Sequence, residues 1–237
     1  MSKIFNSIFK DRKINLLPDF IQDYYYKLLN PLVGFLIKRG IHPNLLTTFG
    51  LIFSILSAIL LAKGYFFWGG LTIMVAGTCD LMDGKVARAT GLGSKFGALY
   101  DSAIDRYSEV VMFFGVCFYF IVNEMYITSI AGFIAVNGSL MVSYIRAKSE
   151  SLGLQCKVGL MQRQERIVFL AFGALFGNIT FVSTYPLSLM FVVWIIAVSA
   201  NYTAVQRLYY VWKETFNLSP IIKEEKNEKE GLQEQDL

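Results

Sequence analysis

Long apolar runs separated by short polar segments dominate the pattern along this chain. Six of them cover roughly residues 45–62, 66–82, 98–122, 126–147, 167–181 and 186–210. A helix needs about 20 apolar residues to cross a bilayer, and each run approaches that length, the fifth being the shortest. The pattern therefore predicts an all-α integral membrane protein with six transmembrane helices.

The segment before the first run has a different pattern. Between about residues 18 and 39, apolar residues recur near the helical period among polar ones. This spacing predicts an N-terminal amphipathic helix that lies in the membrane interface. Its apolar positions are Phe20, Ile21, Tyr24, Leu28 and Leu29.

The C-terminal end is rich in Lys, Glu and Gln, a composition typical of a solvated, disordered segment. We therefore expect three parts along the chain. They are a cytoplasmic and interfacial N-terminal segment, residues 1–40, a six-helix domain, residues 41–216, and a charged, disordered tail, residues 217–237.

Composition supports a membrane protein, because 54% of the residues are hydrophobic and the mean hydropathy is +0.47. The basic residues give an orientation. If the N-terminus is cytoplasmic, Lys63 is the one member of the 22 Lys and Arg residues in an outer loop, and Arg106 lies inside a helix. We therefore expect both termini and the polar loops beside the acidic residues on the cytoplasmic side of a prokaryotic cell membrane. The bases flank membrane spans, which favours anionic lipid headgroups over nucleic acid as their partners.

Four carboxylates lie within 26 residues at the junction of the second and third runs. Asp80 and Asp83 are spaced i, i+3, and Asp101 and Asp105 are spaced i, i+4, so each pair shares a helix face. Four uncompensated Asp side chains near the middle of a membrane would cost on the order of 10 kcal/mol. Divalent cations would relieve this cost, and an oxygen-only ligand set favours Mg²⁺ or Mn²⁺. The alternative is a set of helix-end carboxylates that are solvated at the interface.

The spacing of these acids and of the small residues between them resembles the signature of the CDP-alcohol phosphatidyltransferases. Eight residues match at fixed positions, in the pattern Asp80-x2-Asp83-Gly84-x2-Ala87-Arg88-x8-Gly97-x3-Asp101-x3-Asp105. The resemblance implies a six-helix membrane enzyme, with homodimers typical of the family, that transfers a phosphatidyl group from a CDP-linked lipid to an alcohol and releases CMP. The lipid is CDP-diacylglycerol or an ether-linked analogue.

The chemistry of such a transfer suggests a role for each motif residue. We expect Asp80, Asp83 and Asp101 to hold one or two Mg²⁺ ions that bind the pyrophosphate. Asp105 adds to this metal site, and the resemblance also makes it the candidate general base for the acceptor hydroxyl. The residues expected beside the nucleotide are Gly84, Ala87 and Gly97, which leave space for it, and Arg88, which holds it or its phosphates.

A second nucleotide-side segment precedes the first apolar run. The sequence His42-Pro43-Asn44 followed by Thr47 is typical of a helix start, with Pro and capping side chains. Helix capping is one interpretation of Asn44 and Thr47. The family resemblance suggests another, in which they contact the cytidine side of the site.

The clue to the acceptor lies at the junction of the fourth and fifth runs. Ser143, Arg146, Arg163 and Arg166 could converge on a phosphate, because guanidinium groups suit phosphate oxygens. The alternative is that these arginines are ordinary cytoplasmic anchors. The segment is similar to the phosphatidylinositol phosphate synthase subgroup, which implies inositol 1-phosphate as acceptor, with glycerol 3-phosphate as runner-up. A cation channel or transporter is a third interpretation of the acids, but it gives no reason for the spaced small residues.

Overall fold

The computed structural model describes residues 19–156, 158–177 and 185–235. All regular secondary structure in these ranges is α-helical, in agreement with the predicted fold class. The helices are α2 (Asp19–Lys38), α3 (Pro43–Ala62), α4 (Phe66–Thr90), α5 (Lys95–Val122), α6 (Tyr126–Ser151), α7 (Arg163–Leu175) and α8 (Leu187–Gln235).

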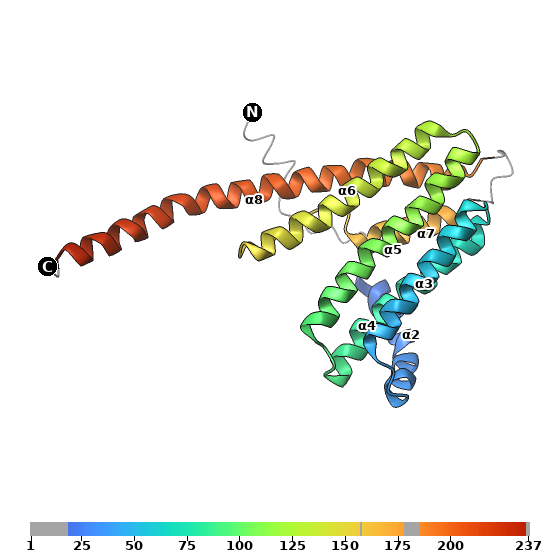
Figure 1. Ribbon diagram of the computed structural model, residues 1–237, viewed down its shortest axis with the longest axis horizontal. Coiled ribbons are helices and arrows are strands. Elements are labelled where there is room, and N and C mark those ends of the chain that lie inside the picture. Colours follow the sequence, from blue (N-terminus) through green and yellow to red (C-terminus); the bar gives the residue numbers. More distant parts are fainter. Residues whose placement is uncertain (1–18, 157, 178–184, 236–237) are drawn as a thin grey trace.

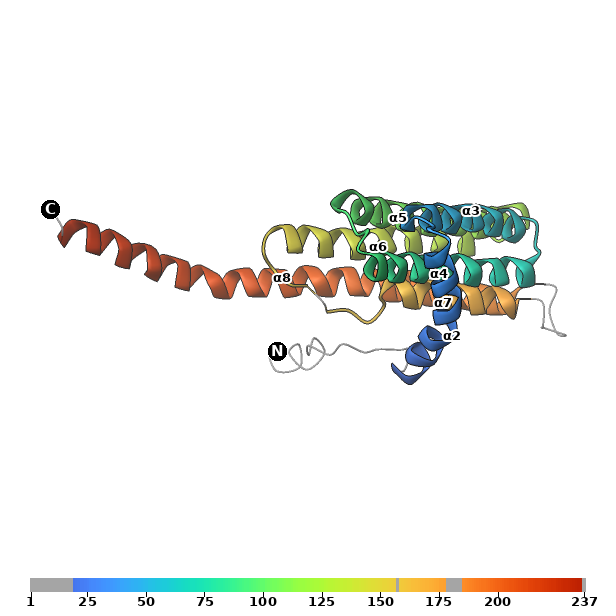
Figure 2. The ribbon, with the colours of Figure 1, turned by 90° about the horizontal axis from the view of Figure 1, so that it is seen from below.

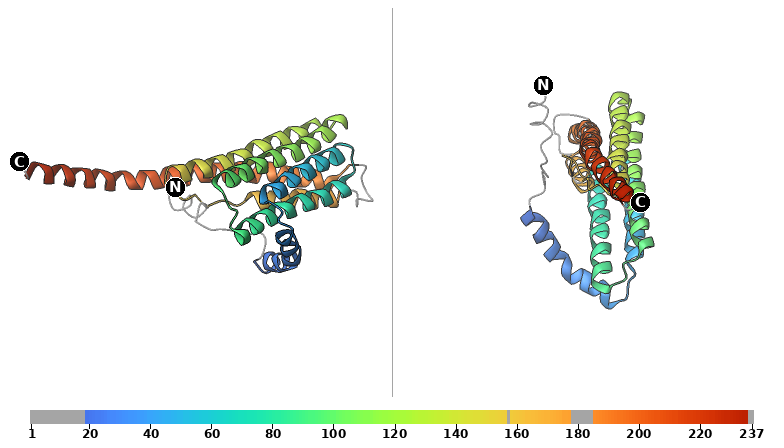
Figure 3. Two further views of the ribbon diagram at one scale, coloured as in Figure 1. Left: turned by 60° about the horizontal axis from the view of Figure 1, so that its bottom comes forward. Right: turned by 90° about the vertical axis from the view of Figure 1, so that its left-hand side faces the viewer.

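Helices α3 to α7 and the first part of α8 run side by side as a bundle (Figures 1 and 2). Helix α2 is steeply inclined to this bundle and contacts α4 (Figure 2). The second part of α8 extends well beyond the bundle (Figure 3). Within the described ranges, α3, α6 and residues Leu187–Phe216 of α8 are long and apolar enough to cross a membrane. The sequence predicted six such spans. The three bundle helices that do not meet this criterion are α4 and α5, which carry the acids, and α7, which has 13 residues.

Local sequence explains where these helices begin and end. Helix α3 begins at Pro43, where the sequence predicted a helix start, but its cap is His42, whose side chain accepts a hydrogen bond from the Asn44 backbone N–H. Helix α4 ends at Gly91, whose φ of 68° is in the left-handed region that glycine tolerates best. Ser94 then caps α5 by accepting from the Gly97 N–H. This short connection places the end of α4 next to the start of α5.

The bundle core is tightly packed around the second half of α5. Phe113, Val116 and Phe120 of α5 are fully buried in the largest apolar cluster of the described residues. Helices α3 and α5 approach so closely that a Cβ on Gly115 would lie 2.3 Å from the backbone oxygen of Ala58. Only glycine permits this contact between the two backbones.

The two ends of the chain differ from the sequence predictions in part. The backbone of α8 continues as a helix to Gln235, whereas the sequence predicted a disordered tail from residue 217. Lys, Glu and Gln have high helix propensity, which allows the preceding span to continue. The predicted helix near residues 18–39 is present as α2, although the side chains of Phe20, Ile21 and Tyr24 lie outside the described residues.

Candidate active site

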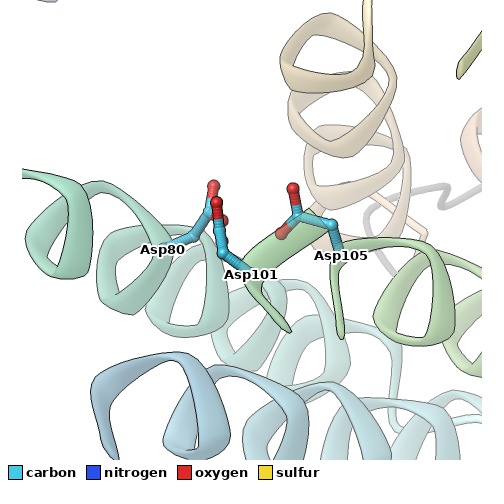
Figure 4. A group of neighbouring side chains, drawn as sticks. All are labelled: Asp80, Asp101 and Asp105. Atoms are coloured by element: carbon cyan, nitrogen blue, oxygen red, sulfur yellow. The ribbon is translucent and has the colours of Figure 1, made fainter. Parts of the chain in front are cut away.

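Three of the four motif carboxylates form one group. Helix α4 contributes Asp80, and α5 contributes Asp101 and Asp105 (Figure 4). One oxygen atom from each lies within 4.8 Å of the others. Asp101 Oδ1 is buried and has no hydrogen-bond partner among the described residues, as expected of an atom meant for a cation. The all-oxygen set fits a hard divalent ion such as Mg²⁺ or Mn²⁺.

The fourth carboxylate faces a different partner. Asp83 is only 5% exposed, and its Oδ2 accepts a hydrogen bond of 2.6 Å from the Thr47 hydroxyl of α3. It is therefore not part of the three-acid group, although the sequence assigned all four acids to one metal site. A step of three residues leaves Asp83 about 60° around α4 from Asp80, and from this position it reaches Thr47 of the neighbouring helix α3. Thr47, which the sequence placed on the nucleotide side, is the residue that holds it.

Arg163, at the start of α7, offsets part of the negative charge of the three-acid group. Its Nη1 lies 2.7 Å from Asp105 Oδ2 and 3.2 Å from Asp80 Oδ2. The sequence assigned Arg163 to the acceptor phosphate, whereas in the structure it bonds to two predicted metal ligands. The contact arises because the first turn of α7 packs beside the acid-bearing face of α4.

The residues assigned to the nucleotide lie where α3, α4 and α5 meet. A Cβ on Gly97 would lie 3.2 Å from Asn44 Oδ1, so this glycine lets the starts of α3 and α5 approach. A Cβ on Gly84 would lie 3.4 Å from an Arg88 guanidinium nitrogen, so the exposed Arg88 side chain reaches back over Gly84. Ala87, between them, is half-buried.

A cavity of about 270 Å³ begins at the acids and runs between the helices. Asp80, Asp83, Asp105 and Arg163 lie at its polar end, and most of its other lining residues are apolar. These residues come from α3, α4, α5 and α7. Helix α2 adds Tyr25, whose hydroxyl lies 2.6 Å from Thr78 Oγ1. The site thus joins a charged group to an apolar space within the bundle.

The residues assigned to the acceptor do not share one partner. Arg146 is exposed and pairs with Glu150 of its own helix at 3.0 Å, and Ser143 near it is half-buried. Arg166 is fully buried and binds Glu109 of α5, with Nε 2.6 Å from Oε1. Neither Ser143, Arg146 nor Arg166 lines the cavity. The predicted convergence of three arginines on one phosphate is therefore not the arrangement in this structure, because each guanidinium has a different carboxylate partner.

Glu109 and Arg207 are among the buried charged residues to which the sequence interpretation gave no role. Glu109 follows Asp105 by four residues and so continues the acidic face of α5, a spacing that was available in the sequence. Arg207 lies within the last apolar run, where a basic residue is costly and therefore informative. Its guanidinium donates to the backbone oxygens of Val142, at 2.6 Å, and Val158, at 2.8 Å. Arg207 is also within interaction distance of Arg146 and Arg166.

Comparisons with known proteins indicate the family of this chain. The family profile of CDP-alcohol phosphatidyltransferase matches residues 40–205. The phosphatidylinositol phosphate synthase of Mycobacteroides abscessus is 32% identical over 192 residues, which cover 80% of this chain and 86% of that protein. The archaetidylinositol phosphate synthase of Methanothermobacter thermautotrophicus is 33% identical over 152 residues, which cover 64% of this chain and 73% of that protein.

Solved structures show the same likeness. The crystal structure of Mycobacterium tuberculosis phosphatidylinositol phosphate synthase with CDP-DAG bound has a TM-score of 0.71 and 32% identity, covering 78% of this chain and 94% of that one. The same enzyme in complex with manganese and citrate gives a TM-score of 0.70 at 32% identity, covering 77% of this chain and 88% of that one.

The chain belongs to the CDP-alcohol phosphatidyltransferase family. It is therefore an integral membrane enzyme of phospholipid synthesis, and the interpretation of its acids as part of a cation channel or transporter is wrong. Within the family, it is similar to the phosphatidylinositol phosphate synthases, as the sequence predicted.

Proposed function

We propose that this protein transfers the phosphatidyl group of CDP-diacylglycerol to inositol 1-phosphate and releases CMP. The observation that carries the proposal is the position of the three-acid group, because two of its members, Asp80 and Asp105, line a largely apolar cavity. A CDP-linked lipid has the same two parts, a charged pyrophosphate next to apolar chains. The relative that binds CDP-DAG supports this donor, and the archaeal relative makes an ether-linked donor the alternative.

Asp80, Asp101 and Asp105 would hold the divalent ion, Mg²⁺ or Mn²⁺, and the manganese-bound relative supports this assignment. Such an ion, when bound, offsets the pyrophosphate charge and stabilises the charge on departing CMP. Asp83 remains near the site through its hydrogen bond to Thr47, and we assign this pair to the nucleotide side together with Asn44, Gly84 and Gly97. Ala87 and Arg88 complete the nucleotide side.

Asp105 has a second task in this proposal. The acceptor hydroxyl oxygen attacks the phosphorus that bears the diacylglycerol, and the bond from this phosphorus to the CMP oxygen breaks. The hydroxyl proton passes to a carboxylate oxygen of Asp105, which lines the cavity. This is a single direct displacement, so it predicts no covalent lipid–enzyme intermediate.

The acceptor phosphate would lie near the basic residues between α6, α7 and α8. Ser143 and Arg146 are at the end of α6, and the buried Arg166 and Arg207 lie behind them. Exposed Arg146 pairs only with Glu150 of its own helix among the described contacts, and an exposed pair of this kind is weak enough to exchange for a phosphate. The relatives that are named phosphatidylinositol phosphate synthases support inositol 1-phosphate as that acceptor.

We also propose the membrane arrangement that the sequence predicted. Helices α4, α5 and α7 would cross the membrane with the three qualifying helices, which gives six spans with both termini and the active site on the cytoplasmic side. Helix α2 would lie in the interface, because Leu28, Leu32 and Phe35 form an exposed apolar stripe at helical spacing. A homodimer is the assembly typical of the family, and we propose it here.

Purified protein with CDP-diacylglycerol and Mg²⁺ tests the acceptor directly. CMP release would be compared for inositol 1-phosphate, glycerol 3-phosphate, inositol and serine, with the lipid product identified by mass spectrometry. We expect release with inositol 1-phosphate and formation of phosphatidylinositol phosphate. Release with glycerol 3-phosphate alone would make the protein a phosphatidylglycerol phosphate synthase, and release only with an unphosphorylated acceptor would contradict the role of the basic residues.

A further inference from the structure

Two ion pairs join α5 to α7 like successive rungs. Asp105 and Glu109 are one turn apart on α5, and Arg163 and Arg166 are one turn apart on α7. Asp105 pairs with Arg163 at 2.7 Å, and Glu109 pairs with Arg166 at 2.6 Å. The two rungs have the same chemistry and lie side by side, but their surroundings are different.

The Glu109–Arg166 rung is fully satisfied. Both side chains are buried, at 2% and 0% exposure, and they make two parallel hydrogen bonds. The remaining donors of Arg166 reach the backbone oxygens of Met161, at 3.2 Å, and Ser139, at 3.5 Å. Removing either partner would leave an uncompensated buried charge. This rung therefore fixes the first turn of α7 on α5.

The Asp105–Arg163 rung is incompletely satisfied. The contacts of Arg163 with Asp105 and Asp80 are all made by one nitrogen, Nη1. Its Nε is buried without a hydrogen-bond partner in the part of the chain that the structure describes. A buried donor without a partner is costly. A different position of the Arg163 side chain, in which Nε donates a hydrogen bond, would avoid this cost. Both partners lie at the cavity, where a ligand can reach them.

We propose that Arg163 is an exchangeable counter-ion of the active site, which binds Asp80 and Asp105 in the metal-free enzyme and is displaced when a divalent ion binds. The inference rests on the proposed role of these acids as metal ligands. Without a cation, three carboxylates within 4.8 Å of one another repel strongly, and the Arg163 charge relieves that repulsion. A divalent ion uses the same oxygens and repels the guanidinium, so the two cations compete.

The Glu109–Arg166 ion pair limits the movement that metal binding can cause. Because Glu109 and Arg166 hold the first turn of α7, metal binding displaces the Arg163 side chain while the helix remains in place. The released guanidinium lies at the polar end of the cavity with its Nε and Nη donors available. A lipid-linked pyrophosphate is the type of anion that such a fork binds. Metal loading thus prepares both the metal site and a basic group for the donor.

Mn²⁺ binding to the full-length protein in nanodiscs, without substrate, tests this competition. Electron paramagnetic resonance would count free Mn²⁺ for wild type, Arg163→Gln and Arg163→Lys. Loss of the competing guanidinium should tighten Mn²⁺ binding of Arg163→Gln by about tenfold or more, the scale of one charged hydrogen bond. Arg163→Lys keeps the charge and should stay close to wild type. Lys95→Gln, which removes an exposed charge from the start of α5, should change Mn²⁺ affinity by less than about twofold because solvent screens it.

Two further readouts separate competition from a merely structural role. Arg163→Gln should unfold at a lower temperature than wild type without Mn²⁺, and at a similar temperature with saturating Mn²⁺, because the loaded state no longer uses the contact. In Arg163→Ala, free guanidinium ion at a non-denaturing concentration should weaken Mn²⁺ binding again. The same guanidinium should have no effect on wild type.

Unchanged or weaker Mn²⁺ binding by Arg163→Gln would overturn the proposal and leave the metal site itself intact. A destabilisation of Arg163→Gln that is equally large with and without Mn²⁺ would also overturn it, because Arg163 would then remain bound to the acids in the loaded state. If wild type and variants all bind no Mn²⁺ and release no CMP, the proposed function fails together with the inference.

Discussion

Helix α5 passes through two different environments. Its first half carries Asp105, which lines the cavity, and Asp101, whose Oδ1 is buried without a partner among the described residues. Its second half contains Gly115, which packs directly against the α3 backbone, within a fully buried apolar cluster. From this difference we expect the second half to stabilise the fold and the first half to serve the proposed active site. Substitutions in the first half should therefore reduce activity with little loss of stability, and those in the second half should do the reverse.

The largest effect is expected in the first half of α5, at Asp105. Asp105→Asn keeps the size of the side chain but removes the proton acceptor and one metal ligand. CMP release should fall by about 1,000-fold or more, within the range typical of a catalytic acid or base. The unfolding temperature should stay close to that of wild type, because Asp80 remains as a carboxylate partner of Arg163, at 3.2 Å. Substantial activity in a well-folded Asp105→Asn protein would remove Asp105 from the mechanism.

Glu109→Gln tests the boundary between the two halves. The substitution leaves the Arg166 charge buried without its counter-ion, which typically costs about 3–5 kcal/mol of stability. We expect a large fall in unfolding temperature. The matched control is the double variant Glu109→Met with Arg166→Met, which removes both charges and should recover much of this loss. A single variant as stable as wild type would mean that the pair does not hold α7 in place.

The sequence predicted which residues of the first half of α5 and its neighbours belong to the candidate site, but not which partners they have. The i, i+3 and i, i+4 spacings identified the acids, because helical periodicity is a local property. The partners of Asp83, Arg163 and Arg166 could not be predicted, because they depend on how α3, α5 and α7 face one another. For residues 217–235, composition predicts disorder, whereas the backbone continues the helix α8, because Glu and Lys also favour helices.

In the packed half, Gly115→Ala should separate α3 from α5. The added Cβ would lie 2.3 Å from the Ala58 backbone oxygen, a contact that backbone atoms must move to relieve. Overpacking of this kind costs about 1–3 kcal/mol, which a lowered unfolding temperature would report. Gly34→Ala in α2 is the control, because a Cβ there meets nothing within 4 Å and alanine favours a helix. Equal stability of the two variants would contradict the close approach of α3 and α5.

A smaller effect is expected where α3 supports the acids. Thr47→Val removes the hydrogen bond to the buried Asp83 carboxylate but keeps the shape of the side chain. CMP release should fall about tenfold, the scale of one hydrogen bond to a charged group. Thr72→Val is the matched control, since the Thr72 hydroxyl bonds to its own helix at Trp68. Equal activities for the two variants would show that Thr47 does not position Asp83.

The most direct test of the central claim follows both products of one reaction. Full-length protein in liposomes would receive CDP-diacylglycerol, Mg²⁺ and inositol 1-phosphate, and CMP and phosphatidylinositol phosphate would be quantified together. We predict that the two form in equal amounts, that neither forms after Mg²⁺ is chelated, and that Asp105→Asn forms neither. CMP release that continues without inositol 1-phosphate, or product formation that continues without a divalent ion, would contradict the account.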